Sequence, residues 1–404
     1  ARGDQCEACG KVLDPLELLQ PRCSICGGEP VVQSSRHWFF DLPRFSTRIE
    51  RWLTTNEAMP EKVRRFSLNW VAEGLKPRAV TRDNLWGIPA PFPSSTGKTI
   101  YVWFEAVLGY VTATIEWAER MGRPSLWEDY WRDPSTKSVY FIGKDNIPFH
   151  TIILPALLMG YDEELVLPWS VSATEYLTFE GQKFSKSLGV GIWLDQALEF
   201  AEQDYWRYYL VKMRPEQSDS NFSFTSFQSV VNSDLNDTLG NFIHRVLSFI
   251  NTYFNGVIPS PGNLSDDDRM VLSLRSGIGE EVDRLLSEIR LRQALETVIE
   301  LAREGNSYLN RREPWKLVKT NLTEAATVLY TAVQLVWSIT NLLHPFIPAS
   351  AEKIAKMLGR EYRDIGWGRV VEDLNPGSRI AGVSPLFKKI SNGDIEGFRL
   401  KTVH

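Results

Sequence analysis

Apolar residues recur at helical spacing from about residue 226 to residue 358. Along three stretches they return every three or four positions, which is the period of one helix face. The residues that form these stripes are Val231, Leu235, Phe242, Ile243, Val246, Leu247 and Ile250, then Val282, Leu285, Leu286, Ile289, Leu295, Val298, Ile299 and Ala302, then Val328, Leu329, Ala332, Val333, Val336, Ile339 and Leu343. Ser265, followed by three aspartates, is typical of a helix N-terminus. We therefore predict an antiparallel helical bundle.

The segment from residue 98 to residue 174 has a different pattern. The runs TIYVWFEA, SVYFIG and LVLPWSV are aromatic and β-branched, as strands prefer. Between them, GYVTATIEWAERMG and NIPFHTIILPALLMG are typical of helices that end at a glycine. Strands that alternate with helices predict a parallel sheet in an α/β fold.

Composition changes this picture little. The chain has 404 residues, of which 43% are hydrophobic and 24% charged, as in globular proteins of two or three domains. No run approaches 18 apolar residues, so we expect no transmembrane helix and no membrane partner. The first residues show no secretory signal, and we expect a cytoplasmic protein. The net charge of −5 neither supports nor excludes a nucleic-acid partner.

The four cysteines form two C-x-x-C pairs, Cys6 with Cys9 and Cys23 with Cys26. Each pair can offer two thiolates to a tetrahedral Zn²⁺ ion, and four thiolates would close its coordination sphere. The alternative is two buried or redox-active pairs. A redox pair is expected at a helix start after a strand, and neither pair has that setting. We therefore predict a structural zinc site.

Two further patterns suggest ligand binding. In EGQKFSKSLG, Lys183 and Lys186 lie between glycines, so a mobile loop can bring both ammonium groups to a polyphosphate. YVWFEAVLGY (101–110) and GKDNIPFH (143–150) each follow a strand-like run, where open α/β sheets bind ligands. A solvated loop, core aromatics and a packed histidine are the alternative interpretations.

Along the chain, eight motifs follow one another in a recognisable order. They are ARGDQCEACG, PRCSICG, TRDNLWGIPAP, YVWFEAVLGY, FIGKDNIPFHTII, KFSKS, DYWRYYLVKMRPEQSDSNFSF and RREPW. On these motifs, the chain resembles the methionyl-tRNA synthetases, class I aminoacyl-tRNA synthetases, in their archaeal and eukaryotic branch. The resemblance spans nearly all of the sequence. It implies ATP-dependent activation of methionine to methionyl-adenylate and transfer to tRNA(Met).

The resemblance also implies roles for individual residues. KFSKS matches the family's KMSKS signature, with Phe184 in place of Met, so Lys183 and Lys186 would be catalytic and would bind ATP, with Mg²⁺, together with Ser185 and Ser187. The residues that would bind methionine are Trp103, Ala106, Tyr110, Asp145 and His150, with Asp145 on the α-ammonium group. Val107 and Leu154 depart from the family's usual Pro and Trp, and both are apolar.

In the helical region, Pro314 and Trp315 resemble the family's anticodon-reading segment. Asn241 and Arg245 match a facing N-x-x-x-R pair one helical turn apart. An aromatic ring can stack on an unstacked anticodon base. The alternative is a packed Trp in a helix that begins at a proline.

One element of the family pattern is absent from this sequence. The family's HIGH signature precedes its zinc insertion, and no H-x-G-H stretch occurs here. We therefore expect a fragment or one half of a split enzyme, incomplete alone, with the HIGH-containing half as a possible partner. The family's insertion usually carries four Cys pairs that bind two metals. The two pairs here resemble the third and fourth, so they would bind separate metals in a complete enzyme or share one in this chain.

The expected fold class is thus the second half of a class I Rossmann-like nucleotide-binding α/β fold, with an N-terminal zinc-knuckle insertion and a C-terminal α-helical anticodon-binding bundle. The expected domains are 1–97 (zinc insertion), 98–174 (catalytic), 175–238 (KMSKS and stem contact) and 239–404 (anticodon-binding and tail). Two other functions stay open on the sequence. They are a non-catalytic tRNA-binding module and a synthetase for leucine, isoleucine or valine.

Overall fold

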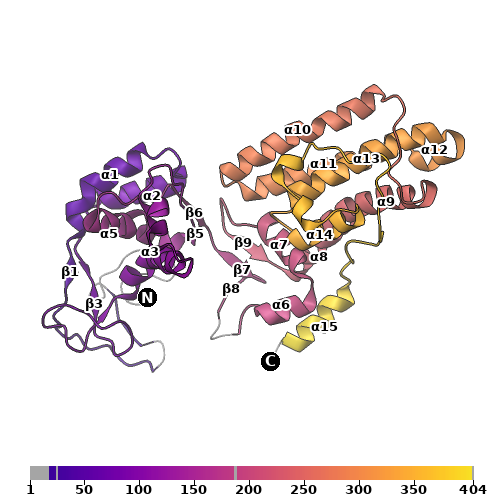
Figure 1. Cartoon of the computed structure of the whole chain (residues 1–404). Coiled ribbons are helices and arrows are strands. Elements are labelled where there is room, and N and C mark those ends of the chain that lie inside the picture. The colour runs from indigo at the N-terminus through magenta and orange to yellow at the C-terminus, as the bar shows by residue number, and fades with distance from the viewer. Residues whose placement is uncertain (1–17, 24–25, 186–188, 403–404) are drawn as a thin grey trace. The chain divides into compact units, whose positions relative to one another are not determined.

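The computed structural model describes residues 18–23, 26–185 and 189–402, and it divides the chain into two compact units, Ala1–Glu175 and Tyr176–His404 (Figure 1). Each has its own apolar core of buried side chains. The predictions that fall on Cys6, Cys9, Lys186 and Ser187 lie outside the described residues.

The first unit packs helices around a short parallel sheet. Strands β5 (Val139–Gly143) and β6 (Ser170–Thr174) pair in parallel from Val139 opposite Ser170 to Gly143 opposite Thr174. The other elements are β1 (Phe39–Phe40), α1 (Ser46–Thr55), α2 (Glu61–Ala72), β2 (Arg78–Ala79), β3 (Thr81–Arg82), β4 (Thr99–Ile100), α3 (Val102–Arg120), α4 (Glu128–Trp131), the π-helix η5 (Phe149–Ile153) and α5 (Leu154–Tyr161). The parallel pairing of β5 with β6 confirms the predicted parallel sheet.

Two predicted strands of this unit are wrong over most of their length. Only Thr99–Ile100 of the run 99–106 is extended, and α3 begins at Val102. Phe104 and Val107, three positions apart, are buried on one face of that helix. In the run 165–171 the strand begins only at Ser170. Pro168 has no N–H to donate to a neighbouring strand, so the preceding residues form a loop.

The second unit begins with a three-stranded sheet. Its strands are β7 (Leu177–Phe179), β8 (Gln182–Lys183) and β9 (Ser220–Phe222), in the order β8-β7-β9. β7 pairs antiparallel with β8 and parallel with β9. Along the chain, helices α6 (Leu194–Phe200) and α7 (Gln203–Lys212) lie between β8 and β9, and α8 (Phe224–Val230) follows β9. This sheet carries the KFSKS segment.

The rest of the second unit is the predicted bundle, in which α10, α11 and α13 run side by side (Figure 1). Its elements are the π-helix η6 (Val231–Gly240), α9 (Asn241–Tyr253), α10 (Asp266–Ser287), α11 (Leu291–Arg312), α12 (Pro314–Thr320), α13 (Leu322–Leu343), α14 (Pro348–Met357) and α15 (Asn392–Thr402). Ser265 caps α10 as predicted, since its side chain accepts the Asp268 N–H. At Gly305, an added Cβ would lie 2.4 Å from the Phe242 ring, so α9 and α11 pack closely there.

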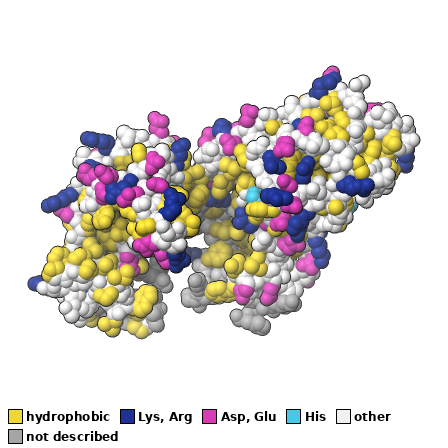
Figure 2. Space-filling view, viewed as in Figure 1, with side chains coloured by type: hydrophobic (Ala, Val, Ile, Leu, Met, Phe, Trp, Pro, Cys, Tyr) yellow, Lys and Arg dark blue, Asp and Glu magenta, His cyan; other side chains and the backbone are white. Residues whose placement is uncertain are grey.

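Helix α13 alone among the described elements is long and apolar enough to cross a membrane. The lengths of the apolar runs in the sequence had predicted no such helix, because single polar residues interrupt the apolar sequence of α13. In its most apolar 18-residue window, 94% is buried inside the protein, so α13 is the central core helix of the bundle. Charged side chains of both signs are interspersed on the face of this unit that Figure 2 shows.

Candidate functional site

A hydrogen bond joins two of the predicted pocket residues. The Tyr110 hydroxyl on α3 lies 3.0 Å from Nε2 of His150, which lies on the π-helix η5. Nδ1 of His150 lies 2.9 Å from the carbonyl oxygen of Asn146. A carbonyl accepts only, so Nδ1 donates its hydrogen and Nε2 accepts the Tyr110 hydroxyl hydrogen. Burial lowers the pKa of His150 below its ordinary value, which keeps this ring neutral.

Aromatic rings surround this pair. Trp103 stacks on Phe149, with ring centroids 4.6 Å apart. Tyr110 meets Tyr140 of β5 edge to face at 5.0 Å. Burial raises the pKa of Tyr140 to about 12, so its hydroxyl is neutral. Phe149 and Tyr140 were not predicted as site residues, and nothing in the local sequence pattern separates them from ordinary core aromatics.

The face of α3 beside these rings is partly open. Trp103, Ala106 and Tyr110 follow one another at spacings of three and four, so they share one face of the helix. Ala106 and Tyr110 are exposed, while Val107 is buried. Leu154 is also fully buried. The two departures from the family pattern, Val107 and Leu154, therefore lie in the core of this unit.

Asp145 lies two positions after the last residue of β5, at the carboxyl end of the parallel pair, and is exposed. Glu175, directly after β6, accepts hydrogen bonds from Lys144 at 2.7 Å and from Lys62 of α2. Burial opposes ionisation of Glu175, but the two lysines outweigh it and hold the pKa of its carboxyl below the usual value. Glu175 was not predicted as a site residue, because the strand-like run 165–171 ends four residues before it.

The KFSKS segment begins on a tight hairpin of the second unit. Lys183 ends β8, is exposed, and has its Nζ atom 5.8 Å from the centre of the Tyr176 ring. Beyond it, Ser185 and Val190 exchange two backbone hydrogen bonds of 3.0 and 2.9 Å. This bridge pairs Ser185 with Val190, and Lys186 and Ser187, which fall between them in the sequence, lie outside the described residues.

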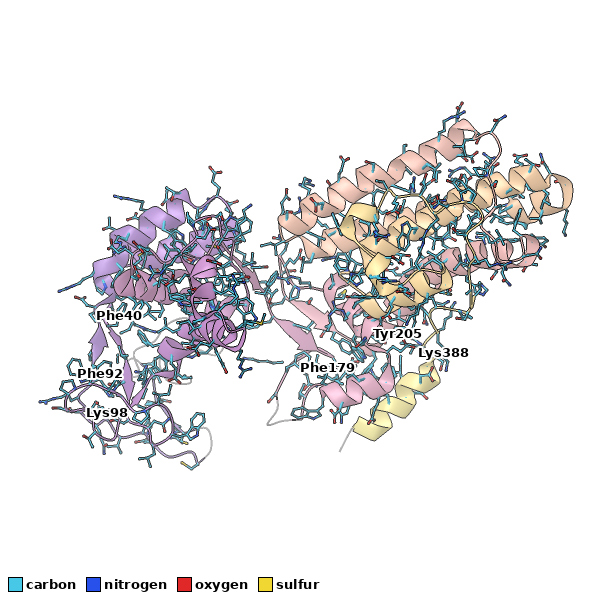
Figure 3. The ribbon with its side chains drawn as sticks, in the orientation of Figure 1. Phe40, Phe92, Lys98, Phe179, Tyr205 and Lys388 are labelled. Atoms are coloured by element: carbon cyan, nitrogen blue, oxygen red, sulfur yellow. The ribbon has the colours of Figure 1, made fainter. Side chains whose placement is uncertain are left out.

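Phe184, which stands where the KMSKS signature has Met, anchors this loop. Its ring lies 5.6 Å from the Phe179 ring, which Figure 3 marks on the small sheet. Gly191 has a φ of +143°, and a Cβ there would lie 2.8 Å from the Phe184 ring. The base of the loop therefore depends on Phe184 and on glycine at position 191.

In the bundle, the structure brings Arg245 of α9 and Trp315 of α12 together. The Arg245 guanidinium carbon lies 5.0 Å from the centre of the Trp315 ring, within cation–π range. Arg245 also donates a hydrogen bond of 3.2 Å to the side chain of Asn310. Pro314 occupies the first turn of α12. Asn310 was not predicted, because its role depends on a contact between α9 and α11.

Asn241 begins α9, one turn before Arg245, and is exposed. It therefore lies on the same side of α9 as Arg245. The arrangement offers an exposed amide, a guanidinium and a partly exposed indole close together. Such groups can hydrogen-bond and stack with an unpaired base.

The described cysteines form a tight turn. The Cys23 N–H donates to the Gly28 carbonyl and the Gly27 N–H donates to the Cys23 carbonyl, both at 2.8 Å. Gly27 has a φ of +72°, which glycine adopts readily. Cys23 and Cys26 are both exposed. Within residues 18–23, 26–185 and 189–402, no three His, Cys, Asp or Glu side chains gather as a metal site.

Comparison with known proteins gives one consistent result. A family model described as tRNA synthetases class I (M) matches residues 1–247, and one described as the anticodon binding domain of methionyl tRNA ligase matches residues 258–402. The methionine–tRNA ligase of Pyrobaculum calidifontis is 48% identical over 399 residues, covering 98% of this chain and 69% of its own length. That of Aeropyrum pernix is 48% identical over 400 residues, covering 98% and 70%.

Solved structures agree. The Mycobacterium tuberculosis methionyl-tRNA synthetase bound by methionyl-adenylate superposes with a TM-score of 0.83 at 25% identity, covering 94% of this chain and 75% of that one. The apo form of the same synthetase has a TM-score of 0.77 at 26% identity, covering 88% and 69%.

Proposed function

The chain belongs to the methionyl-tRNA synthetases of class I, and on that premise we propose which of its residues bind methionine, ATP and tRNA. Its activity is that of a methionine–tRNA ligase, as the resemblance had implied. The predicted catalytic portion and helical anticodon-binding portion are confirmed. The alternatives of a leucine, isoleucine or valine enzyme and of a non-catalytic module are set aside.

The proposed methionine pocket lies on the open face of α3. Trp103, Ala106 and Tyr110 line it, and the neutral His150 ring accepts the Tyr110 hydrogen bond at its base. A neutral, aromatic surface suits a thioether side chain, because sulfur contacts ring edges favourably and no charge has to be desolvated. Asp145 supplies the carboxylate for the α-ammonium group. The Tyr110–His150 hydrogen bond is the observation that carries this assignment.

The proposed phosphate-binding loop is KFSKS. Attack of the methionine carboxylate on the α-phosphate expels pyrophosphate and builds negative charge on phosphate oxygens. Lys183 and Lys186 would meet that charge, and the Ser185 and Ser187 hydroxyls would add donors. Groups that bind the transition state more tightly than the ground state accelerate the step. Mg²⁺ would accompany the ATP. The hairpin and the Ser185–Val190 bridge support this role, because they hold the loop at both ends.

For tRNA, we assign anticodon contact to Asn241, Arg245, Pro314 and Trp315. The cation–π contact holds Arg245 beside the indole, so one base can stack on the ring and hydrogen-bond to the guanidinium.

We also propose a structural zinc site. The Cys23–Cys26 turn fits a metal, because its exposed thiols come from one tight turn. In this chain alone, Cys6 and Cys9 would supply the other two thiolates.

Catalysis also needs the H-x-G-H segment, which this sequence does not contain. We propose that a segment with this motif acts with the chain, either joined upstream or as a separate partner. Because translation uses its product, methionyl-tRNA, we propose a cytoplasmic location, which fractionation would test.

Methionine binding tests the pocket assignment. The parent chain should bind methionine, and His150→Ala should abolish binding measurable by calorimetry while leaving the circular dichroism spectrum unchanged. Unchanged affinity in that variant would show that methionine binds elsewhere.

A further inference from the structure

The hairpin that carries Lys183 turns at two residues in left-handed backbone conformations. Glu180 has a φ of +49° and Gly181 a φ of +81°. Such two-residue turns match the twist of the strands they join, here β7 and β8. The Glu180 N–H donates to the Phe222 carbonyl at 2.8 Å, and the Gly181 N–H donates to the Asn221 side chain at 2.7 Å. The turn is therefore fixed against β9.

The side chain of Glu180 ties the turn to two helices. One carboxylate oxygen, Oε1, accepts the Phe224 N–H at the start of α8 at 3.1 Å. The same oxygen accepts Nη2 of Arg399 from α15 at 2.7 Å. The Arg399 guanidinium carbon also lies 5.2 Å from the centre of the Phe224 ring. One carboxylate thus connects the hairpin, α8 and the C-terminal helix, across 219 residues of sequence.

Helix α15 is held firmly enough to present Arg399. Phe398 is 7% exposed and lies 4.6 Å from the Phe200 ring and 5.6 Å from the Phe224 ring. Before the start of the helix, the side chain of Asn232 exchanges two hydrogen bonds of 2.9 Å with the backbone of Ile390. Figure 3 shows this helix on the same side of the unit as the strand labelled at Phe179.

From these contacts we infer that Arg399 and Glu180 are positioning residues for the phosphate-binding loop. Lys183 follows Glu180 by three residues on a strand pair with a fixed register. Holding the turn in place therefore fixes where Lys183 and the start of the loop lie. The inference rests on the proposed role of this loop in binding ATP phosphates. It adds that the C-terminal helix sets the loop's position.

The expected effect is on catalysis rather than on global stability. The two side chains are 49% and 34% exposed, and ion pairs this open contribute little to the folded state as a whole. Catalytic groups are far more sensitive to position. A misplacement of about 1 Å can cost up to about 10²-fold in rate. The Glu180–Arg399 contact should therefore accelerate the chemical step and leave methionine affinity unchanged.

The test compares Arg399→Ala with Arg399→Lys, which can still pair with Glu180. Arg284→Ala is the matched control, because Arg284 is also 49% exposed and also pairs with glutamates, on α10. Methionine-dependent ATP–pyrophosphate exchange would be measured on protein with an H-x-G-H-containing segment joined upstream of residue 1. Hydrogen exchange of residues 178–185 would be measured on the same proteins.

We expect Arg399→Ala to lower kcat by about 10-fold, with the KM for methionine unchanged, and to speed amide exchange in the hairpin. Arg399→Lys should recover most of the rate, and Arg284→Ala should match the parent. An unchanged kcat in Arg399→Ala, or an equal loss in Arg284→Ala, overturns the inference. Lys183→Ala separates the two claims. If Lys183→Ala is inactive while Arg399→Ala is fully active, only the positioning role fails. If Lys183→Ala is itself active, the proposed role of the loop fails.

Discussion

The Tyr110 hydroxyl donates to Nε2 of His150 across 3.0 Å, and this hydrogen bond joins α3 to the π-helix η5 beside the stacked rings of Trp103 and Phe149. A π-helix contains an extra residue per turn and often occurs at functional sites. Here it places His150 so that Nδ1 also reaches the Asn146 carbonyl. Both ring nitrogens are satisfied while the ring stays neutral, which keeps the proposed methionine pocket uncharged.

Removing this hydroxyl should weaken methionine binding. Tyr110→Phe keeps the ring but leaves Nε2 of the buried His150 without its donor, at a cost of about 1–3 kcal/mol. We expect methionine affinity to fall by about 5- to 150-fold, measured by calorimetry. Tyr130→Phe is the control, because Tyr130 is an exposed tyrosine of the same unit that lies on Trp117. Equal affinities in parent and Tyr110→Phe would count against the pocket.

Acid should destabilise the first unit through His150. Its pKa is lowered by burial, so the unfolded chain binds a proton at higher pH than the folded one. The stability associated with the neutral ring is complete above the unfolded pKa of about 6.5 and is lost as pH falls from there through the folded pKa. Urea unfolding at pH 7.5 and pH 5 should show a larger loss for the parent than for His150→Gln, which does not titrate. The same loss in both proteins would exclude His150 as the cause.

Trp315 should contribute to tRNA affinity and contribute little to the stability of the fold. Trp315→Ala removes a stacking surface worth roughly 1–3 kcal/mol per base, so affinity for a CAU-anticodon tRNA should fall accordingly. Tyr362→Ala, which removes another exposed aromatic side chain of the same unit, is the control. If Trp315→Ala binds the tRNA as well as the parent does, Trp315 is a packing residue only.

Zinc should accompany the purified protein. Metal analysis under reducing conditions should find at least one Zn²⁺ per chain, and Cys23→Ser should lower that content, because a serine hydroxyl is a poor zinc ligand. Less than about 0.3 Zn²⁺ per chain, with all four thiols free to react, would contradict the prediction.

The sequence predicted most reliably what a single element encodes. The bundle was predictable because its helices carry apolar stripes at their own period, and Ser265 because a cap is a local signal. Residues 99–106 were misassigned, because a short aromatic and β-branched run fits a strand or a buried helix equally well. The second stripe was predicted as continuous, but the structure divides it between α10 and α11 at Ile289, where φ is +61° without a glycine.

The candidate site was predictable only where the resemblance supplied it. Tyr140, Glu175 and Asn310 acquire their places from contacts between elements distant in sequence. The Glu180–Arg399 contact is the extreme case. No periodicity or spacing signal connects two residues that meet only after the unit has folded.

The most direct test of the account is methionine-dependent ATP–pyrophosphate exchange with Lys186→Ala. Protein with an H-x-G-H-containing segment joined upstream should be active. Lys186→Ala should lower its kcat by about 10²–10³-fold, as loss of a group that stabilises transition-state charge does, while methionine affinity stays unchanged. An active Lys186→Ala variant would contradict the account, because KFSKS would then be a bystander to the chemistry.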